Sequence, residues 1–317
     1  MSKEMLYLGI DIGGTAVKIG SVTEHGEVIE RDTFSVNFDE YETPILQTVI
    51  KSCHLFMGKF HRTPEAYKAI GVSATGAINT ENGTVEGSAG HIKHWEQSKI
   101  KESMEAEFGL RVQVLNDANA AALGELWKGA AQGKKQVIVV TIGTGVGGGI
   151  IVNGEILLGA HGFAGELGHM PILCTGETCS CGNKGCLEHY GSTSALVNTV
   201  KDAIEHGKIK KPENNKVDGV WIFEEVGKKN PDMMAIVENW IEYIAAGIVG
   251  LIHIFNPEQV LIGGGVSEQQ QLFMETLKEK VQSSVMEHFG RNLEIKAANL
   301  GNKAGMIGAV YYCMQHQ

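Results

Sequence analysis

The stretch LYLGIDIGGTAVKIGSV, residues 6–22, decides the fold. Residues 6–10 form an apolar run that predicts a strand, and residues 17–22 predict a second strand. Two adjacent glycines between them predict a tight turn. Another turn at His25-Gly26 leads to a third predicted strand over residues 28–31. The pattern is typical of a β-meander whose first hairpin is rich in glycine.

The same pattern begins again near the middle of the chain. Residues 136–142 predict an apolar strand, which is followed by Gly143-Thr-Gly-Val-Gly-Gly-Gly149 and a partner strand over residues 150–152. Asn153-Gly154 is a strong hairpin signal before a third strand at residues 156–158. Each half therefore opens with strand, glycine-rich turn, strand, tight turn and strand, which is a coarse structural repeat.

The remaining elements alternate between helix and strand. Apolar spacing and stop signals predict helices over residues 43–60, 98–108, 118–128, 233–255, 270–289 and 304–312. Short apolar runs predict strands over residues 69–72, 112–115, 259–262 and 293–297. This alternation predicts an α/β fold with mixed sheets flanked by helices. We expect two similar domains around a cleft, at residues 1–117 and 118–302, with residues 303–317 packing back on the first.

Composition limits the classes of function. The 317 residues carry a net charge of −10, which argues against a large nucleic-acid interface. The first residues lack the apolar core of a signal peptide, and no window is apolar for the length that a membrane span needs. We therefore expect a cytoplasmic protein without nucleic-acid or membrane partners. Its thiols should be reduced.

Three glycine-rich turns follow apolar strands. Backbone amides of Asp11-Ile-Gly13-Gly14-Thr15 and of Thr141-Ile-Gly143-Thr144-Gly145 can converge on a phosphate. Asp11 can also hold a metal-bound water, and Gly263-Gly264-Gly265 can approach a base or ribose, or bind an anion at a helix start. Each turn alone is more typical of an ordinary hairpin, but the coincidence of three favours nucleotide binding. Neither the P-loop nor the dinucleotide fingerprint matches, because a strand follows Gly148.

Polar residues at two places suit the binding and activation of a compound with several hydroxyl groups. Asp117 stands where a strand gives way to a helix, so it is either an N-cap or a general base for a hydroxyl that attacks a γ-phosphoryl group. Asn116 beside it can hydrogen-bond a neighbouring hydroxyl. Glu166, His169 and Glu188 supply the acceptors and donors that a polyol needs.

A cluster of thiols lies between these polar residues. Cys179, Cys181, Cys186 and His169 fall within eighteen positions and can form a closed tetrahedral zinc site. The alternatives are a disulfide pair or buried unpaired thiols, but the fourth ligand and the reducing compartment favour zinc. Such a metal is structural, because no coordination position stays open. The second nitrogen of His169 would then face the cleft as an oriented donor.

Together these motifs resemble the ROK family of bacterial sugar kinases and repressors. The resemblance covers essentially the whole chain, and its most specific part is Glu166-Leu-Gly-His169 with Cys179-Ser-Cys-Gly-Asn-Lys-Gly-Cys186-Leu-Glu188. It implies the actin-like, hexokinase-like ATPase fold with RNase H-like domains. It also implies structural zinc at the four residues above, sugar contacts from Glu166, His169 and Glu188, and Asp117 as the base with Asn116 on the sugar. The ATP-binding residues that it implies are Asp11, Gly13, Gly14, Thr15, Thr141, Gly143, Thr144, Gly145, Gly264 and Gly265.

Three positions depart from the family pattern. Ala16 stands where the family often has Lys, and Lys18 follows two places later. His91 stands where Asn usually meets the sugar, and Gly76 belongs to Ala-Thr-Gly where Pro-Gly is frequent. We expect Gly76 at the sugar, and His91 either at the sugar or as a surface loop residue.

The resemblance predicts an enzyme that uses ATP and Mg²⁺ to phosphorylate a primary hydroxyl, O6 of a hexose or N-acetylhexosamine. N-acetylmannosamine and glucose are placed first, while N-acetylglucosamine and a β-glucoside stay open. The alternatives are a non-catalytic sugar-sensing regulator and a redox protein that uses Cys179 and Cys181. The first strand at residue 6 leaves no room for the helix-turn-helix of the family's repressors, which favours a kinase. We expect a homodimer.

Overall fold

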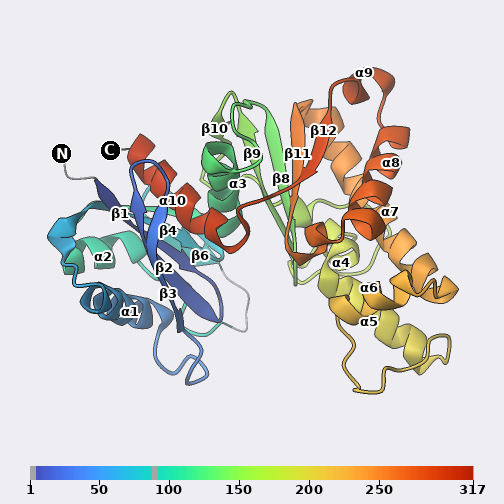
Figure 1. Cartoon of the computed structure of the whole chain (residues 1–317), viewed down its shortest axis with the longest axis horizontal. Helices are drawn as coiled ribbons and strands as arrows, with labels where there is room; N and C mark the ends of the chain where they lie inside the picture. The colour runs from blue at the N-terminus through green and yellow to red at the C-terminus, as the bar shows by residue number, and fades with distance from the viewer. Residues whose placement is uncertain (1–4, 88–91, 317) are drawn as a thin grey trace. The chain divides into compact units, whose positions relative to one another are not determined.

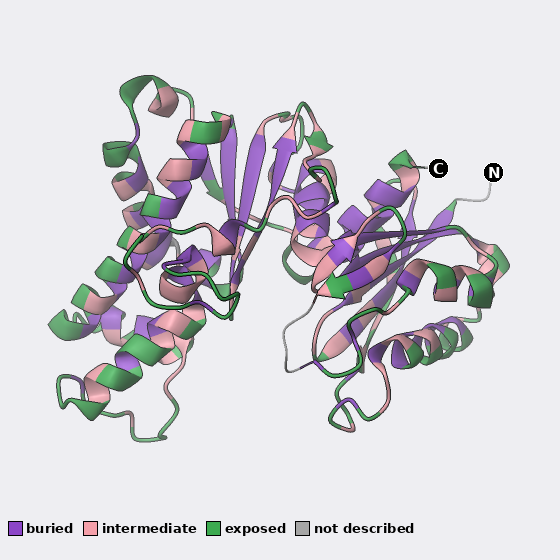
Figure 2. Ribbon diagram, turned by 180° about the vertical axis from the view of Figure 1, so that it is seen from behind, coloured by how far each residue is buried: buried purple, intermediate pink, exposed green. Residues whose placement is uncertain are grey.

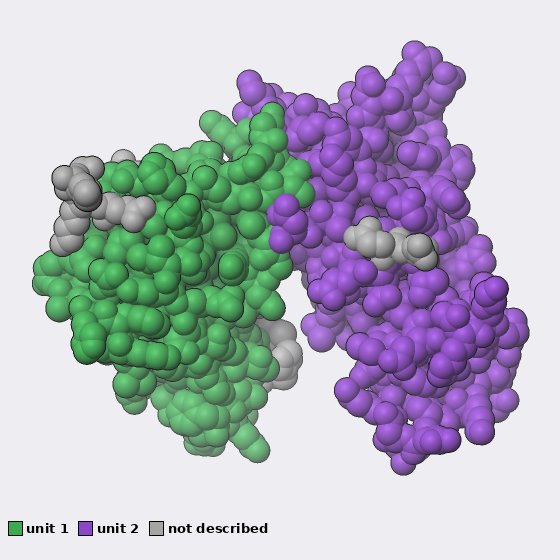
Figure 3. Space-filling model, in the orientation of Figure 1, with its two compact units in different colours: residues 1–133, 154–165, 300–317 green, residues 134–153, 166–299 purple. Residues whose placement is uncertain are grey.

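A computed structural model describes residues 5–87 and 92–316 and divides into two compact units (Figures 1 and 3). Unit 1 comprises residues 1–133, 154–165 and 300–317, and unit 2 comprises residues 134–153 and 166–299. The expected boundary after residue 117 differs from this division, because the helix that follows residue 116 packs on the unit 1 side. Each unit is an α/β body with one main sheet.

The main sheet of unit 1 has the strand order β3-β2-β1-β4-β7. β1, β2 and β3 form the predicted antiparallel meander, and β4 and β7 run parallel to β1. A small hairpin of β5 and β6 follows β4. The strands are β1 (Leu6–Ile12), β2 (Ala16–Thr23), β3 (Val28–Ser35), β4 (Tyr67–Ala74), β5 (Ala77–Asn79), β6 (Thr84–Gly87) and β7 (Val112–Asn116).

Helices cover both faces of this sheet (Figure 1). α1 (Ile45–Lys59) and α2 (Ile100–Phe108) bury apolar residues against one face, where Leu8 and Ile10 of β1 also point. α10 (Ala304–Gln315) covers the other face through Met306 and Val310, which pack beside Tyr7. α3 (Asp117–Lys128) packs against α10. The two helix backbones approach so closely that a side chain at residue 308 would overlap the carbonyl of Ala120, which is why this position is Gly308.

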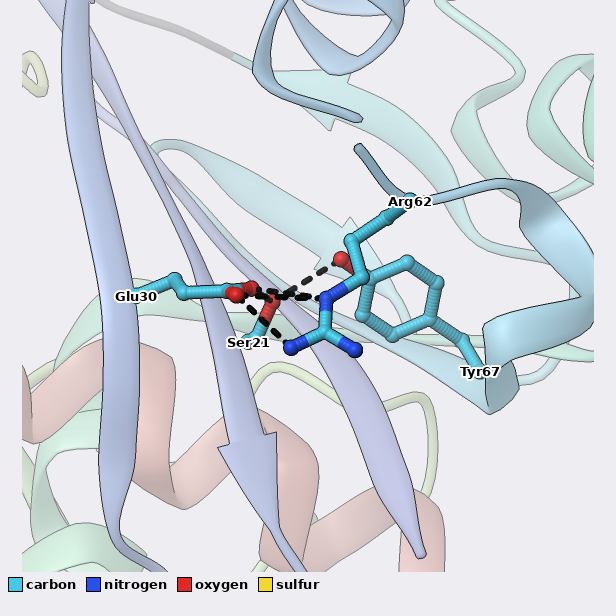
Figure 4. A network of polar contacts seen from close by, with 4 residues as sticks. All are labelled: Ser21, Glu30, Arg62 and Tyr67. Carbon is cyan, nitrogen blue, oxygen red and sulfur yellow. Dashed lines mark hydrogen bonds and ion pairs between the residues drawn. The ribbon is translucent and has the colours of Figure 1, made fainter. Parts of the chain in front are cut away.

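A partly buried polar network braces unit 1 near the amino end of β1 (Figure 4). Arg62 donates to both oxygens of Glu30, and Ser21 joins Glu30 to Tyr67. Burial raises the pKa of the Glu30 carboxyl, but hydrogen bonds from Arg62 and Ser21 outweigh it and hold that pKa below its ordinary value. Because Ser21 pairs with Leu8, this network lies away from the turn at Gly13.

Unit 2 repeats the opening hairpin of unit 1 and then builds a parallel sheet. Its strands run in the order β9-β8-β11-β12, with β9 antiparallel to β8 and the others parallel. β9 begins inside the glycine-rich run and turns at Asn153 into the short β10 of unit 1. The strands of unit 2 are β8 (Val137–Ile142), β9 (Val146–Val152), β11 (Gln259–Gly263) and β12 (Glu294–Ala297), and β10 of unit 1 is Glu155–Ile156.

The helices of unit 2 pack around α7, which has the length and composition of a membrane span but is half buried. It contacts α4, α5, α6 and α8, as a core helix does, and buried residues line the sheets and inner helix faces (Figure 2). The predicted helix over residues 270–289 is broken at Met286, whose extended backbone starts a new helix. These helices are α4 (Leu187–Gly191), α5 (Thr193–Glu205), α6 (Gly219–Gly227), α7 (Pro231–Phe255), α8 (Glu275–Ser284) and α9 (Glu287–Gly290), with a π-helical turn (Gln270–Met274) before α8.

Candidate active-site residues in each unit

Strand register brings three predicted site segments of unit 1 to one edge of its sheet. In the parallel part of the sheet, Ile12 pairs with Ala74 and Ala74 pairs with Asn116. The turn after Asp11, the Gly76 bend and the start of α3 therefore all follow the carboxyl ends of neighbouring strands. Ligands of open α/β sheets commonly bind at such an edge.

Asn116 organises the start of α3. Its side-chain oxygen accepts from the amides of Ala118 at 2.9 Å and Asn119 at 3.2 Å, so Asn116 is the N-cap. Its amide nitrogen donates to the Gly76 carbonyl at 3.0 Å, which joins two predicted sugar contacts. The N-cap alternative for Asp117 is therefore wrong.

Asp117 is the first residue of the twelve-residue helix α3. Its Oδ1 accepts from the Ala118 amide at 2.8 Å, and the residue is partly exposed. A negative charge is favoured at this end of a helix. Proton acceptance from a substrate hydroxyl requires a carboxylate that the substrate can reach, and Asp117 offers one at the sheet edge.

The first glycine turn is held by its carbonyls and leaves amide donors unused. The Gly13 amide donates to the Ala16 carbonyl, the Gly14 carbonyl accepts from the Tyr41 hydroxyl at 2.8 Å, and the Thr15 carbonyl accepts from the Val36 amide. Within the described part of the chain, the amides of Gly14 and Thr15 have no hydrogen-bond partner. Such paired amides in a glycine turn suit an anion.

The segment after residue 91 lies beside these turns. A Cβ on Gly14 would touch Ile92 at 3.2 Å, and the fully buried Trp95 donates its indole N–H to the Thr75 carbonyl at 2.9 Å. Packing therefore fixes this segment next to Gly76. His91 itself lies outside the described residues, so its expected sugar contact stays a prediction.

In unit 2, the other two glycine turns meet at one cavity of about 670 Å³. Thr141 at the end of β8 pairs with Gly263 at the end of β11, which sets the two turns side by side. Gly143 and Thr144 line the cavity from one turn, and Gly265 lines it from the other. Its walls come from α5, the start of α6 and the 3₁₀ turn after Gly264, and include the apolar residues Val197, Val217, Phe223 and Val266.

The glycines around this cavity have different physical roles. A Cβ on Gly143 or Gly265 would meet no atom within 4 Å, so the chain is open there. Gly264 has φ +89°, and a Cβ would overlap the Ile142 carbonyl, so only glycine fits. A cavity of this size, mostly apolar with a few polar groups, suits a small ligand such as a nucleoside.

The glycine-rich strand β9 also makes room for the predicted sugar contacts of unit 2. Glu188 accepts from the Val146 amide at 3.0 Å, and a Cβ on Gly145 would overlap its carboxylate. Leu167 occupies the space that a side chain on Gly148 would take. The exposed Glu166 and the 3₁₀ turn Leu167–His169 therefore lie along the same strand start as Glu188.

The three cysteines and His169 converge as expected. Their ligand atoms all lie within 4.8 Å of one another, with Cys181 Sγ and Cys186 Sγ 3.7 Å apart and His169 Nδ1 3.7 Å from Cys179 Sγ. Tetrahedral zinc with bonds of about 2.3 Å places its sulfur ligands roughly 3.8 Å apart, so the donor set fits the metal. All six cysteines of the chain are unpaired, as zinc ligation requires and a disulfide does not allow.

The thiols of this cluster differ in pKa. Burial acts to raise the pKa of the Cys179 thiol, but hydrogen bonds from the Cys181 backbone and from His169 bring it down to about 6, while burial and the two neighbouring thiols raise the pKa of Cys186 to about 12. Gly182 and Gly185 have φ of +87° and +72°, and the loop turns back at both. The Tyr190 hydroxyl, on α4, accepts from the amide of Glu177 at 2.6 Å. α4 therefore holds the part of the loop that precedes Cys179.

Comparison with known proteins covers nearly the whole chain. The model of the ROK family matches residues 7–316. A glucokinase from Halalkalibacterium halodurans is 32% identical, over 98% of this chain and 96% of that protein. A xylose repressor from Caldicellulosiruptor bescii is 33% identical, over 96% of this chain and 76% of that protein.

Solved structures show the same architecture. A ROK family glucokinase from Streptomyces griseus, in complex with glucose and AMPPNP, has a TM-score of 0.81 at 29% identity and covers 98% of this chain and 99% of its own. A protein from Listeria monocytogenes, proposed to be an N-acetylmannosamine kinase, has a TM-score of 0.82 at 30% identity with the same coverage. The expected hexokinase-like α/β architecture is thereby confirmed.

Proposed function

The chain belongs to the ROK family and is an ATP-dependent sugar kinase, and we propose that it phosphorylates O6 of a hexose or N-acetylhexosamine. Glucose and N-acetylmannosamine are the first candidates. The observation that carries the proposal is the strand register of unit 1. It brings a turn with unused amides and the Asn116–Asp117 corner to one sheet edge.

For the nucleotide, we assign the cavity of unit 2 to the adenosine and the first glycine turn to the phosphates. The apolar walls beside Gly265 suit a base, and Thr144 is among the polar residues that line the cavity. In unit 1, the amides of Gly14 and Thr15 supply donors, and Asp11 supplies the carboxylate that would hold hydrated Mg²⁺. Mg²⁺ bound with ATP would neutralise charge on the transferred phosphoryl group.

For the sugar, we assign different tasks to the two units. Asp117 accepts the proton of the attacking hydroxyl, while Asn116 and the Gly76 bend fix the sheet edge beneath it. From unit 2, Glu166, Glu188 and the Nε2 side of His169 serve as hydroxyl contacts, since Nδ1 of His169 faces Cys179. The polar cavity of about 430 Å³ that Glu188 and Thr144 share offers further room beside these groups.

We also propose that His169, Cys179, Cys181 and Cys186 hold one structural zinc ion. The spacing of their ligand atoms supports this assignment, and the four protein donors leave no place for a water ligand. The metal would then fix the position of His169 and of the loop that leads into Glu188. Under this assignment the thiols are not available for redox chemistry.

Two earlier expectations remain predictions. These are a cytoplasmic location and a homodimer. Sedimentation velocity of the purified protein checks the dimer. A single sedimenting species with the mass of one chain would refute the dimer.

The proposal is tested with a panel of hexoses and amino sugars. We expect ADP release that depends on one or two sugars, and a product whose phosphorus and carbon NMR spectra place the phosphate on O6. The xylose repressor relatives make a sugar-sensing regulator the second candidate. Sugar binding without ADP release would favour that regulator and refute the kinase.

A further inference from the structure

A continuous line of polar contacts crosses three neighbouring strands next to the first glycine turn. Asp11 pairs with Lys18 across β1 and β2, and with Ser73 across β1 and β4. Lys18 Nζ lies 3.0 Å from Oδ2 of Asp11, and the Ser73 hydroxyl donates to Oδ1 at 2.8 Å. Both carboxylate oxygens are therefore held, each from a different strand.

Lys18 has a second anchor outside the sheet. Its Nζ donates to Oδ1 of Asn302 at 3.4 Å, in the 3₁₀ turn (Gly301–Lys303) that leads into α10. The Lys18 side chain is 30% exposed and that of Asp11 is 16% exposed, so the pair is only partly screened by water. Ser73 is completely buried.

The start of α10 closes the space over this line. A Cβ on Gly305 would lie 2.8 Å from Oδ1 of Asp11 and 2.9 Å from the Ser73 hydroxyl. The Asp11 carboxylate thus cannot swing toward α10. Its rotamer is fixed by Lys18 on one side and by Ser73 and Gly305 on the other.

The position of the pair matters because Asp11 immediately precedes the turn with unused amides. An uncompensated carboxylate there would repel a triphosphate. A lysine in contact with that carboxylate cancels its charge and also points its oxygens. Ala16, where the family often has Lys, carries no charge and no hydrogen-bond donor on its side chain, so it can perform neither task.

We infer that Lys18, anchored by Asn302, is the positioning residue that orients and neutralises Asp11 for Mg·ATP. This inference rests on the proposed kinase function and assigns to it a residue outside the glycine turns. Lys18 acts through Asp11 and not on the sugar, so its loss changes nucleotide and Mg²⁺ dependence and leaves sugar affinity unchanged.

The test compares Lys18→Met, Lys18→Arg and Asn302→Ala with the parent protein. Lys18→Met should raise the KM for Mg·ATP and the half-saturating free Mg²⁺ by about tenfold each, the loss that one charged hydrogen bond produces. Lys18→Arg keeps the charge and should restore most of the affinity, and Asn302→Ala should show a smaller shift in the same direction. The KM for the sugar should change by less than about twofold throughout.

A matched control is Lys59→Met, which removes an ion pair of the same unit at the surface, where Lys59 meets Asp32 at 2.7 Å. It should leave both nucleotide and Mg²⁺ dependence unchanged. If Lys18→Met does not fold, Asn302→Ala and Lys18→Arg decide the question. Unchanged Mg²⁺ dependence in the folded variants would overturn the inference, as would an equal rise in sugar KM.

Calorimetric binding of Mg·AMPPNP separates this inference from the proposed function. A parent protein that binds the nucleotide but releases no ADP with any sugar would refute the kinase, while the Lys18 variants would still test the binding role. A parent protein that fails to bind Mg·AMPPNP would refute both.

Discussion

The glycine turns that open the two units share a pattern but differ in what surrounds them. In unit 1 the turn follows Asp11, whose carboxylate is held by Lys18 and Ser73. In unit 2 the matching position is the uncharged Thr141, and the glycines beyond it make room for Glu188 and Leu167. The same hairpin is therefore built twice, and the residues that fold against it decide its chemistry.

Removing the charge of Asp11 and, separately, the hydroxyl of Thr141 should break this comparison most strongly. Asp11→Asn keeps the size of the side chain but removes the charge proposed to serve Mg²⁺. Turnover should fall about 10²- to 10³-fold, as when other preorganised charges are lost from active sites. Thr141→Ala should change turnover only a few-fold. Equal losses in steady-state assays would show that the two turns serve the same purpose.

The cysteine loop gives the second largest effect. Cys181→Ser should remove about one zinc per chain, measured by plasma mass spectrometry. Sugar affinity should fall about 10- to 100-fold, as when the supports of a metal site are lost. Binding of Mg·AMPPNP should change little.

The matched control for the loop is Cys174→Ser. Cys174 is exposed and is not part of the four-residue cluster. The Cys174→Ser variant should retain its zinc and its full kinase activity. A parent protein that is active without zinc would contradict the structural role of the metal.

Substitutions at two glycines of one turn should distinguish an effect on packing from an effect on ligand contact. Gly145→Ala should displace the Glu188 carboxylate, cost about 1 kcal/mol through loss of its hydrogen bond from the Val146 amide, and weaken sugar binding. Gly143→Ala adds its methyl group to open space, so it should leave the melting temperature unchanged and raise the KM for ATP. Calorimetric melting and steady-state kinetics measure the two effects. The reverse pattern would mean that Gly145, not Gly143, faces the nucleotide.

The smallest effect on activity is expected at the opposite end of the unit 1 sheet. Glu30→Gln should cost about 1–3 kcal/mol of unfolding free energy at neutral pH and leave turnover unchanged. The folded-state pKa of Glu30 is lowered, so its stabilisation is present above the ordinary carboxyl pKa of 4.5 and is lost as pH falls through the folded value. The difference between parent and variant should therefore shrink in acid.

Denaturant unfolding at several pH values measures this difference. Glu102→Gln is the control, since its ion pair with Lys99 is largely exposed and should contribute almost nothing. A gap between parent and Glu30→Gln that stays constant from neutral pH down to pH 3 would contradict the linkage.

Much of the fold could be predicted because its strands are short apolar runs between glycine turns. The meander, β4, β7, β8, β11 and β12 all lie where the pattern places them. α5 and α6 were not predicted. α5 has Leu196, Val200 and Ile204 at helical spacing, a signal that could have revealed it. α6 follows a long polar loop. At the break, the Met286 amide donates to Nε2 of His253 at 3.2 Å. His253 lies on α7, far away in the sequence, so the local pattern does not predict this contact.

The candidate site was likewise predicted only in part from the sequence. Residue spacing was enough to group the cysteines with His169, because they are close in sequence. The capping role of Asn116, the hold of Lys18 on Asp11 and the contact of Glu188 with Val146 depend on strand register and on packing between distant segments. No local pattern encodes those contacts.

The central claim is that Asp117 at the sheet edge accepts the proton of the attacking sugar hydroxyl. The most direct measurement is single-turnover phosphoryl transfer by Asp117→Asn, with sugar binding measured on the same sample. Asp232→Asn is the control, because Asp232 also lies in the first turn of a helix but is exposed on α7. We predict that Asp117→Asn binds sugar as the parent does and transfers phosphate at least about 10²-fold more slowly, the lower bound for general base catalysis. Transfer at the parental rate would contradict the account.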